Sequence, residues 1–296
     1  MAINLSRVAA GTMNTNEGHQ KTLKASIVHQ DQLIGCITRH FYSGIKMKIQ
    51  FETDFTIRHV FQPVYTLSGR LLALEIQSRF NSPDGALAMP AEIGINLLQP
   101  AQKDALFYEQ LGVIEAYADW FIEHQVLLSI NIDATLAALL LQDNQLCQRL
   151  RRQPFIVVEI SESFPQLSAG KNNATVRRLS ELFTLWLDDF GSGQATLTPL
   201  YDGLFTYVKI DKRFYWRLFS HPGSDTVMDS LLRNINLLCQ GIIVGGIEKK
   251  AYFNHLDRAG VLGLQGFLWP AVGGEQLDTL CKVPPEFIDA DAPDNH

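Results

Sequence analysis

The 296-residue sequence lacks the long apolar segments of a membrane or secreted protein. Its most apolar stretch, residues 136–141, is far shorter than the roughly 18 residues that a membrane-spanning helix needs. The first residues, among them Asn4, Arg7 and Glu17, have no apolar core of the kind that a secretory signal carries. We therefore predict a cytoplasmic protein that does not associate with a membrane.

Paired cysteines and excess basic residues are also absent. No two of the four cysteines form a CxxC motif, and their wide spacing fits neither a zinc module nor a disulfide framework. The 25 basic and 31 acidic residues give a net charge of −6, which argues against direct nucleic-acid binding because phosphate contacts require a basic face. The eight histidines form no HxH or HExxH pattern, which argues against a histidine-ligated metal.

From about residue 55 onward, short β-branched runs alternate with patterns of helical period. The strand candidates are residues 59–67, 71–80, 126–133, 155–161, 185–189, 206–210, 241–247 and 260–266. The helix candidates are residues 105–124, 135–151, 173–183, 224–238 and 249–259. This alternation predicts an α/β fold with a parallel sheet, and eight strands suit a closed barrel. Only a short turn around Ser68 and Gly69 separates the first two strands, so they must be antiparallel. We predict a modified TIM (β/α)8 barrel with one antiparallel strand.

The sequence divides into three parts. Residues 1–46 are polar and aperiodic, and Met47 would make a natural start, so we expect an N-terminal extension that is poorly ordered or a misassigned start. Residues 47–283 form the predicted barrel domain. Residues 284–296 end in Asp289, Asp291 and Asp294 and are expected to be an acidic tail.

Polar side chains stand at the ends of several strand candidates. They are Asn131, Glu159, Asp188, Asp189 and Lys209, with Glu75 and Arg79 on one face of the second strand. Taken alone, any one of these carboxylates is more simply a strand end or a helix cap. Their recurrence favours a shared site, because the carboxyl ends of barrel strands surround one mouth.

Carboxylates gathered at one mouth need compensating positive charge, and hard divalent cations such as Mg²⁺ or Mn²⁺ supply it through oxygen ligands. Asp188 and Asp189 are adjacent and could bridge two cations about 3.5–4 Å apart, which positions a hydroxide for attack on a phosphodiester. Lys209 would orient this water or stabilise developing negative charge. The residues thus predict metal-dependent phosphodiester hydrolysis, with Glu75, Asp188, Asp189 and Lys209 as the catalytic residues.

At these residues the chain resembles the EAL domain family, from about residue 55 to residue 272. The motifs that carry the resemblance are Phe61-Gln-Pro-Val, Leu74-Glu-Ile-Gln-Ser-Arg, Ser129-Ile-Asn, Glu159-Ile-Ser-Glu-Ser, Asp188-Asp-Phe-Gly-Ser-Gly, Lys209-Ile-Asp and Leu264-Gln-Gly. The resemblance implies hydrolysis of cyclic di-GMP to linear pGpG, which lowers a second messenger that controls biofilm, fimbriae and motility.

The resemblance also implies roles for individual side chains. The implied ligands of two Mg²⁺ or Mn²⁺ ions are Glu75, Asn131, Glu159, Asp188 and Asp189. The implied substrate contacts are Gln62, Arg79 and Gln265. Glu162 resembles the residue that anchors the loop after Asp189.

One departure from the family pattern concerns the second cation. The family's Glu-Gly-Val-Glu appears here as Gly245-Gly-Ile-Glu248, so a residue without a side chain replaces a second-metal glutamate. The retained carboxylates favour a cyclic di-GMP phosphodiesterase of reduced activity. The alternative is a weak or inactive EAL-like regulator, of the kind that controls flagellar and fimbrial genes, which binds cyclic di-GMP or a protein partner such as a transcription regulator. The family resemblance also allows a homodimer.

Overall fold

The structure is a computed structural model of the chain, and it describes residues 48–50, 54–82, 88–89, 91–193, 196–220, 224–252, 256 and 260–288. The chain divides into two compact units. Among the described residues, the smaller unit contains those up to Arg58 and those between Ser78 and Leu97, and the larger contains His59–Gln77 and those from Leu98 to Ile288. The predicted extension, residues 1–46, lies outside the described residues.

The smaller unit contains short antiparallel pairings and one helix. Strand β1 (Lys48–Gln50) pairs with the start of β2 (Asp54–Tyr65), and the end of β3 (Leu71–Asn81) pairs with β4 (Ala88–Met89). Helix α1 (Ala91–Leu97) lies close against Phe80, because a Cβ atom on Gly94 would be 2.5 Å from that ring.

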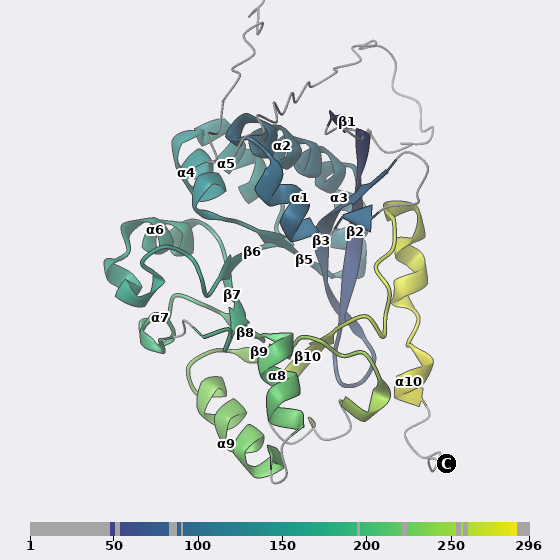
Figure 1. The fold of residues 1–296 in the computed structure, drawn as a ribbon, viewed down its shortest axis with the longest axis vertical. Coiled ribbons are helices and arrows are strands. Elements are labelled where there is room, and N and C mark those ends of the chain that lie inside the picture. The colour runs from purple at the N-terminus through teal and green to yellow at the C-terminus, as the bar shows by residue number, and fades with distance from the viewer. Residues whose placement is uncertain are drawn as a thin grey trace, which may run out of the picture. The chain divides into compact units, whose positions relative to one another are not determined.

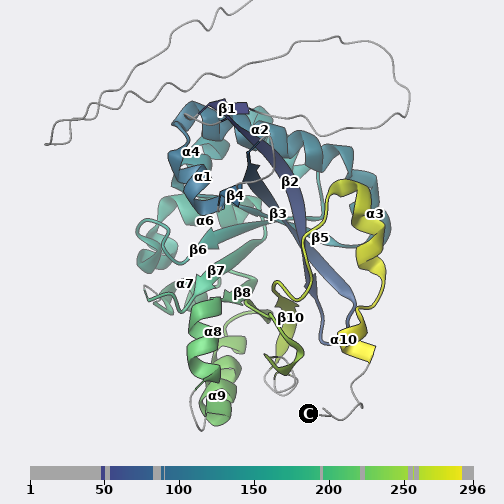
Figure 2. The same cartoon turned by 45° about the vertical axis from the view of Figure 1, so that its right-hand side comes forward.

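The larger unit is a closed barrel of eight strands (Figures 1 and 2). Beside β2 and β3 it contains β5 (Leu127–Asn131), β6 (Ile156–Ser161), β7 (Leu185–Phe190), β8 (Tyr207–Ile210), β9 (Gly241–Val244) and β10 (Val261–Gln265). The strand order is β2-β10-β9-β8-β7-β6-β5-β3, and the pairing of β2 with β3 closes it. Strand β2 is antiparallel to β10, and the other neighbours from β3 round to β10 are parallel. The predicted barrel with one reversed strand is confirmed.

The helices of the larger unit are shorter than the sequence suggested. They are α2 (Pro100–Ala116), α3 (Ala118–His124), α4 (Ala134–Gln142), α5 (Asn144–Arg151), α6 (Ala174–Leu182), α7 (Thr198–Tyr201), α8 (Lys212–Phe219), α9 (Ser224–Asn236) and α10 (Pro285–Ile288), with 3₁₀ helices η1 (Leu167–Asn172), η2 (Lys250–Tyr252) and η4 (Gly274–Cys281). The helix expected at residues 135–151 breaks at Asp143, whose carboxylate accepts hydrogen bonds from the N–H groups of Gln145 and Leu146 and so begins a new helix. No helix in the described part of the chain is long and apolar enough to cross a membrane.

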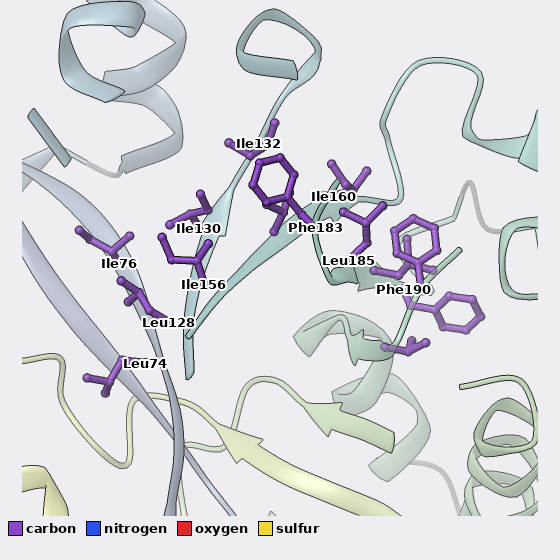
Figure 3. Packing of buried hydrophobic residues seen from close by; sticks show 14 of the residues in the cluster. Leu74, Ile76, Leu128, Ile130, Ile132, Ile156, Ile160, Phe183, Leu185 and Phe190 are labelled. Atoms are coloured by element: carbon purple, nitrogen blue, oxygen red, sulfur yellow. The ribbon is translucent and has the colours of Figure 1, made fainter. Parts of the chain in front are cut away.

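The strands separate two apolar regions. Side chains on their outer faces, such as Ile76, Ile130, Ile160 and Leu185, pack beneath the helices (Figure 3). The opposite faces point into the barrel, because side chains alternate along a strand. A second buried cluster fills this interior and contains Val64, Ala73, Val157, Trp186 and Ile243.

The end of the described chain packs against the barrel instead of forming a tail. The ring of Phe287 stacks on Trp269 at 5.2 Å, and the Trp269 indole N–H donates to the Glu286 carboxylate at 3.2 Å. Both Phe287 and Val283 lie against Gly69 in the β2–β3 turn, where φ is +76° and a Cβ atom would be within 3 Å of them. Residues 284–288, which we expected in the acidic tail, thus belong to the larger unit, and residues 289–296 lie outside the described residues.

Candidate functional site

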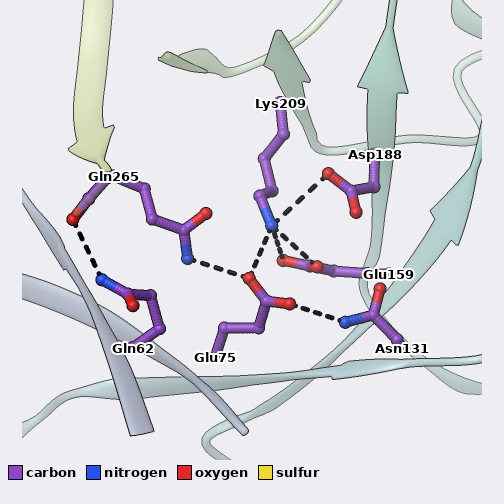
Figure 4. A network of polar contacts seen from close by, with 8 residues as sticks. Gln62, Glu75, Asn131, Glu159, Asp188, Lys209 and Gln265 are labelled. Atoms are coloured by element: carbon purple, nitrogen blue, oxygen red, sulfur yellow. Dashed lines mark hydrogen bonds and ion pairs between the residues drawn. The ribbon is translucent and has the colours of Figure 1, made fainter. Parts of the chain in front are cut away.

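A ring of polar side chains lies at the carboxyl ends of the parallel strands, one layer above the apolar interior (Figure 4). Alternation explains its membership, because each ring residue stands two positions from an interior apolar or small residue on the same strand. On β3, for example, Glu75 follows Ala73, and on β7, Asp188 follows Trp186. The ring comprises Gln62, Glu75, Asn131, Glu159, Asp188, Lys209 and Gln265.

Lys209 lies at the centre of this ring and is 4% exposed. Its Nζ donates to Glu75 Oε2 at 3.0 Å and to Glu159 Oε1 and Oε2 at 3.0 and 2.9 Å. It also forms an ion pair with Asp188 Oδ1 at 3.4 Å. One ammonium group thus contacts three carboxylates from three different strands.

Two amide side chains complete the coordination of Glu75. Asn131 Nδ2 donates to Glu75 Oε1 at 2.8 Å, and Gln265 Nε2 donates to Glu75 Oε2 at 2.9 Å. Both oxygens of this carboxylate, which is 8% exposed, therefore accept hydrogen bonds from within the protein. The buried charge is stabilised by donors on β5, β8 and β10.

Gln62, which we predicted to contact substrate, uses its amide nitrogen to tie the barrel together. Its Nε2 donates to the carbonyl oxygens of Trp269 at 2.7 Å and Gly266 at 3.2 Å. These bonds fix β2 to the segment that follows β10. The donor atom of this predicted contact is thus engaged within the protein.

Burial and charge shift the ionisation of the ring in opposite directions. Burial raises the pKa of Glu159 well above its usual value, with the charges of Glu75 and Asp188 adding to the effect. Burial also disfavours charge on Glu75, yet the Lys209 ammonium and the hydrogen bonds to Glu75 bring its pKa below the usual value. For Lys209, burial favours the neutral amine, but the three carboxylates raise its pKa well above normal. Lys209 is therefore a charged ammonium in the folded protein.

The strand that carries the paired aspartates changes direction at the second one. The register of β7 against β8 shifts between Leu187 and Phe190, and Asp189 has a φ of 57°, a left-handed conformation uncommon outside glycine. Asp189 is exposed, whereas Asp188 faces the ring. Although the residue is exposed, partial desolvation of its carboxylate and the neighbouring Asp188 charge raise the pKa of Asp189 to about 6. The two aspartates thus differ in environment although they are adjacent in sequence.

The carboxylate of Glu162 binds the loop after β7. Glu162 Oε2 accepts hydrogen bonds from the backbone N–H groups of Gly191 at 2.6 Å and Ser192 at 3.0 Å. The glycine is required here, because its φ is +94° and a Cβ atom would lie 2.4 Å from the Phe214 ring. One buried carboxylate therefore sets the path of this loop.

Arg79 and Gly245 contribute no side-chain atom to the ring. Arg79, a predicted substrate contact, is exposed on the part of β3 that belongs to the smaller unit. Gly245 follows β9 and supplies no ligand atom, and a Cβ atom there would lie 2.9 Å from the Ile210 carbonyl oxygen. The expectation that a metal-binding glutamate is missing at this position rests on comparison with the family motif alone.

The carboxylates that were predicted to bind a divalent cation contact side-chain donors in this structure. Within the described residues, no group of three or more His, Cys, Asp or Glu side chains could hold a metal ion. The Lys209 ammonium lies among the carboxylates that would coordinate one, and Asn131 directs its amide nitrogen, a donor, at Glu75. Binding of Mg²⁺ or Mn²⁺ remains a prediction from the sequence.

Two tryptophans lie near the ring and were not among the predicted site residues. Trp186 lies inside the barrel beneath Asp188, which strand alternation could have revealed. Trp216, on α8, donates its indole N–H to the Gly246 carbonyl oxygen at 2.8 Å and so fixes the segment after β9. The contact of Trp216 with Gly246 could not be predicted from the sequence, because the two residues lie on different elements.

The barrel, its reversed strand and the polar ring define a class, and comparison with known proteins agrees: the EAL domain family matches residues 50–271, and the chain belongs to this family. Among curated relatives, the anti-FlhC(2)FlhD(4) factor YdiV of Salmonella paratyphi B is 35% identical over 222 residues, covering 75% of this chain and 94% of that protein.

Solved structures point to the same relative. The EAL-like domain protein YdiV has a TM-score of 0.70 and 31% identity, with 77% of this chain and 97% of that chain covered. A PaMucR phosphodiesterase in complex with c-di-GMP is similar in fold, with a TM-score of 0.60 and 20% identity over 75% of this chain and 94% of that one.

The expectation of an active cyclic di-GMP phosphodiesterase is wrong. The curated relatives that match over nearly their whole length are named for acting against FlhC(2)FlhD(4), and the matching structure is named EAL-like. The physical feature that accompanies this correction is Gly245, which brings no carboxylate where the family motif has a second-metal glutamate.

Proposed function

We propose that this chain is a regulator that works by binding a protein assembly, either FlhC(2)FlhD(4) or a transcription regulator of similar kind. The observation that carries the proposal is the 35% identity to an anti-FlhC(2)FlhD(4) factor across 94% of that factor's length. The coverage matters, because a shared barrel alone would not transfer a function.

The polar ring supports this proposal because its charge does not favour binding of a phosphodiester. Three carboxylates surround a single ammonium at the barrel mouth, so an approaching phosphodiester meets mostly negative charge. A divalent cation would reverse this field, but Gly245 removes one of the expected ligands. The mouth then contributes to stability, and binding of the partner takes place through the surface of the fold.

Cyclic di-GMP as a ligand stays a prediction from the family resemblance. Two of the three predicted contacts, Gln62 and Gln265, already use their amide N–H groups on Trp269, Gly266 and Glu75. Binding would have to break these bonds, and their loss costs free energy when the groups are buried. This favours a protein over a nucleotide as the ligand.

Purified full-length protein mixed with purified FlhC(2)FlhD(4) tests the proposal directly. We expect a complex in size-exclusion chromatography and a Kd below about 1 μM in calorimetry, equivalent to about −8 kcal/mol. An Asp188→Asn variant should bind equally well, since this side chain faces the interior ring. Absence of binding at tenfold higher concentration would overturn the proposal, as would formation of pGpG from cyclic di-GMP by the wild-type protein beyond that of the Asp188→Asn variant.

A further inference from the structure

The rim of the barrel beyond β8, β9 and β10 carries positive charge around an exposed aromatic ring. We propose that this surface, called the basic rim below, binds an acidic segment of the protein partner, and that an apolar side chain of that segment covers the ring. This assignment rests on the proposed function, because it places the same partner on one part of the surface. The exposed residues of the basic rim are Lys212, Arg213, Arg217, Lys249 and Phe267.

Contacts between α8 and two other segments place Lys212 beside Phe267. Lys212 begins α8, which follows β8, and its Nζ lies 5.9 Å from the centre of the Phe267 ring in the segment after β10. The indole N–H of Trp216 on α8 donates to the Gly246 carbonyl oxygen at 2.8 Å, which fixes the segment after β9 against the same helix. Segments that follow three adjacent strands therefore meet at the basic rim.

The other cations of the basic rim lie on α8 or against it. Arg213 and Arg217 are four positions apart on α8 and so share one face of the helix. Lys249 Nζ lies 4.9 Å from the centre of the Tyr252 ring, and that ring packs against Phe219 of α8 with 5.0 Å between the ring centres. Four cationic side chains are thus collected around one helix.

The charge of this surface is opposite to that of the whole chain. Residues 211–217 contain three basic side chains and one acidic one, and residues 248–250 contain two and one, whereas the complete sequence has a net charge of −6. Within the part of the chain that the structure describes, none of the four cations of the basic rim forms an ion pair, while the exposed Lys171 and Arg178 each pair with a carboxylate. The basic rim is therefore complementary to an acidic partner.

Two features of the basic rim are unfavourable in the protein alone. Lys212 and Arg213 lie in the first turn of α8, where the positive end of the helix dipole repels cations. The ring of Phe267 is 69% exposed, and contact of an apolar ring with water is unfavourable. An acidic segment with an apolar side chain relieves both, because its carboxylates pair with the cations while its side chain covers the ring.

A protein segment fits this surface better than a nucleic acid does. Glu248 is exposed beside Lys249, and the barrel mouth contains the carboxylates of Glu75, Glu159 and Asp188. A nucleic acid presents a regular row of phosphates that would meet these acids as well as the cations. A short acidic segment places its carboxylates only where the cations are.

Charge reversal at the start of α8 separates binding from folding. Arg213→Glu puts a favourable charge at the positive end of the helix dipole, so its melting temperature should equal or exceed that of wild type. We expect its Kd for purified FlhC(2)FlhD(4), measured by calorimetry, to be raised at least about tenfold, and Phe267→Ala should weaken binding by a similar factor. Between about 0.1 and 0.5 M NaCl, binding of wild type should weaken more steeply than binding of Arg213→Glu.

The matched controls change equivalent side chains elsewhere on the larger unit. Arg70→Glu reverses an exposed charge in the turn before β3, at the end of the barrel opposite the mouth. Leu237→Ala truncates an apolar side chain that is 82% exposed just after α9. Both variants should bind FlhC(2)FlhD(4) within about twofold of wild type. Losses equal to those of Arg213→Glu and Phe267→Ala would contradict a localised binding surface.

The outcomes distinguish the binding surface from the proposed function. If wild type binds FlhC(2)FlhD(4) and both rim variants bind equally well, the assignment of the basic rim is wrong while the proposed function stands. If wild type does not bind, the proposed function fails and the assignment fails with it. A DNA duplex of about 20 base pairs and random sequence that binds wild type with a Kd below about 1 μM, but does not bind Arg213→Glu, would show a nucleic-acid surface and would also overturn the assignment.

Discussion

Gly245 donates its backbone N–H to the carbonyl oxygen of Ile210 at 3.1 Å, and a Cβ atom on Gly245 would lie 2.9 Å from the same oxygen. The ends of β8 and β9 approach each other here more closely than a side chain permits. The backbone packing at position 245, where this chain departs from the family motif, therefore favours glycine.

Replacing Gly245 should therefore destabilise the protein whatever the new side chain is. We expect Gly245→Ala and Gly245→Glu each to lower the free energy of unfolding by about 1–3 kcal/mol in urea denaturation, the usual cost of overpacking.

The control is Gly112→Ala on α2, where an added Cβ meets nothing within 4 Å. This change should stabilise by up to about 1 kcal/mol, as expected for a helix interior. Equal stability of Gly245→Ala and wild type would contradict the close approach.

Glu162 should control the order of the loop that follows the paired aspartates. Glu162→Ala leaves the Gly191 and Ser192 N–H groups without their acceptor, at a cost of about 1–3 kcal/mol. Hydrogen exchange should accelerate at these two amides, and less so in Glu162→Gln, which keeps one acceptor oxygen.

A change at an exposed glutamate provides the comparison. Glu181→Gln, which removes an ion pair with Arg178 on the surface of α6, should leave both amides protected. Unchanged exchange in Glu162→Ala would show that another contact holds the loop.

The stacked ring of Phe287 should contribute to the stability of the larger unit. We expect Phe287→Ala to cost about 2 kcal/mol, less than a fully buried phenylalanine because this side chain is half-buried. The tryptophan fluorescence of Trp269 should change as well, since the two rings stack with an angle of 11°. Ile288→Ala, at an exposed position, should stay within about 0.5 kcal/mol of wild type.

Glu109 on α2 should make stability depend on pH. Burial raises its pKa to about 7, and its Oε1 atom has no hydrogen-bond partner among the described residues. Between the unfolded value near 4.5 and this folded value, the folded state holds a proton that the unfolded state has lost. Stability therefore falls as the pH rises through this window, and the full penalty is present above pH 7.

We expect Glu109→Gln to remove this decline and to stabilise the protein at pH 8 by about 1–2 kcal/mol, a value reduced for the partial exposure of the side chain. Urea denaturation at pH 5 and pH 8 measures the difference. Glu123→Gln, at an exposed position on α3, should show no such pH-dependent gain. An equal gain for Glu109→Gln at both pH values would contradict the explanation.

Strand alternation explains how much of the site could be predicted from the sequence. Asn131, Glu159, Asp188 and Lys209 were identified from their places at strand ends and Glu75 from its strand face, whereas Gln265 came from the family resemblance alone. The structure brings these six side chains into one ring. Asp189 could not be separated from Asp188 in this way, because the bulge that exposes it depends on the pairing of β7 with β8.

The amino-acid order by itself determined the sequence of strands and helices, the reversed first strand and the side chains that face the mouth, because period and turn length are local properties. Only the tertiary structure decided what those side chains do to one another. That three carboxylates from three strands meet the ammonium of Lys209 depends on how far a flexible side chain from β8 reaches across a closed barrel, and no spacing along the chain contains that distance.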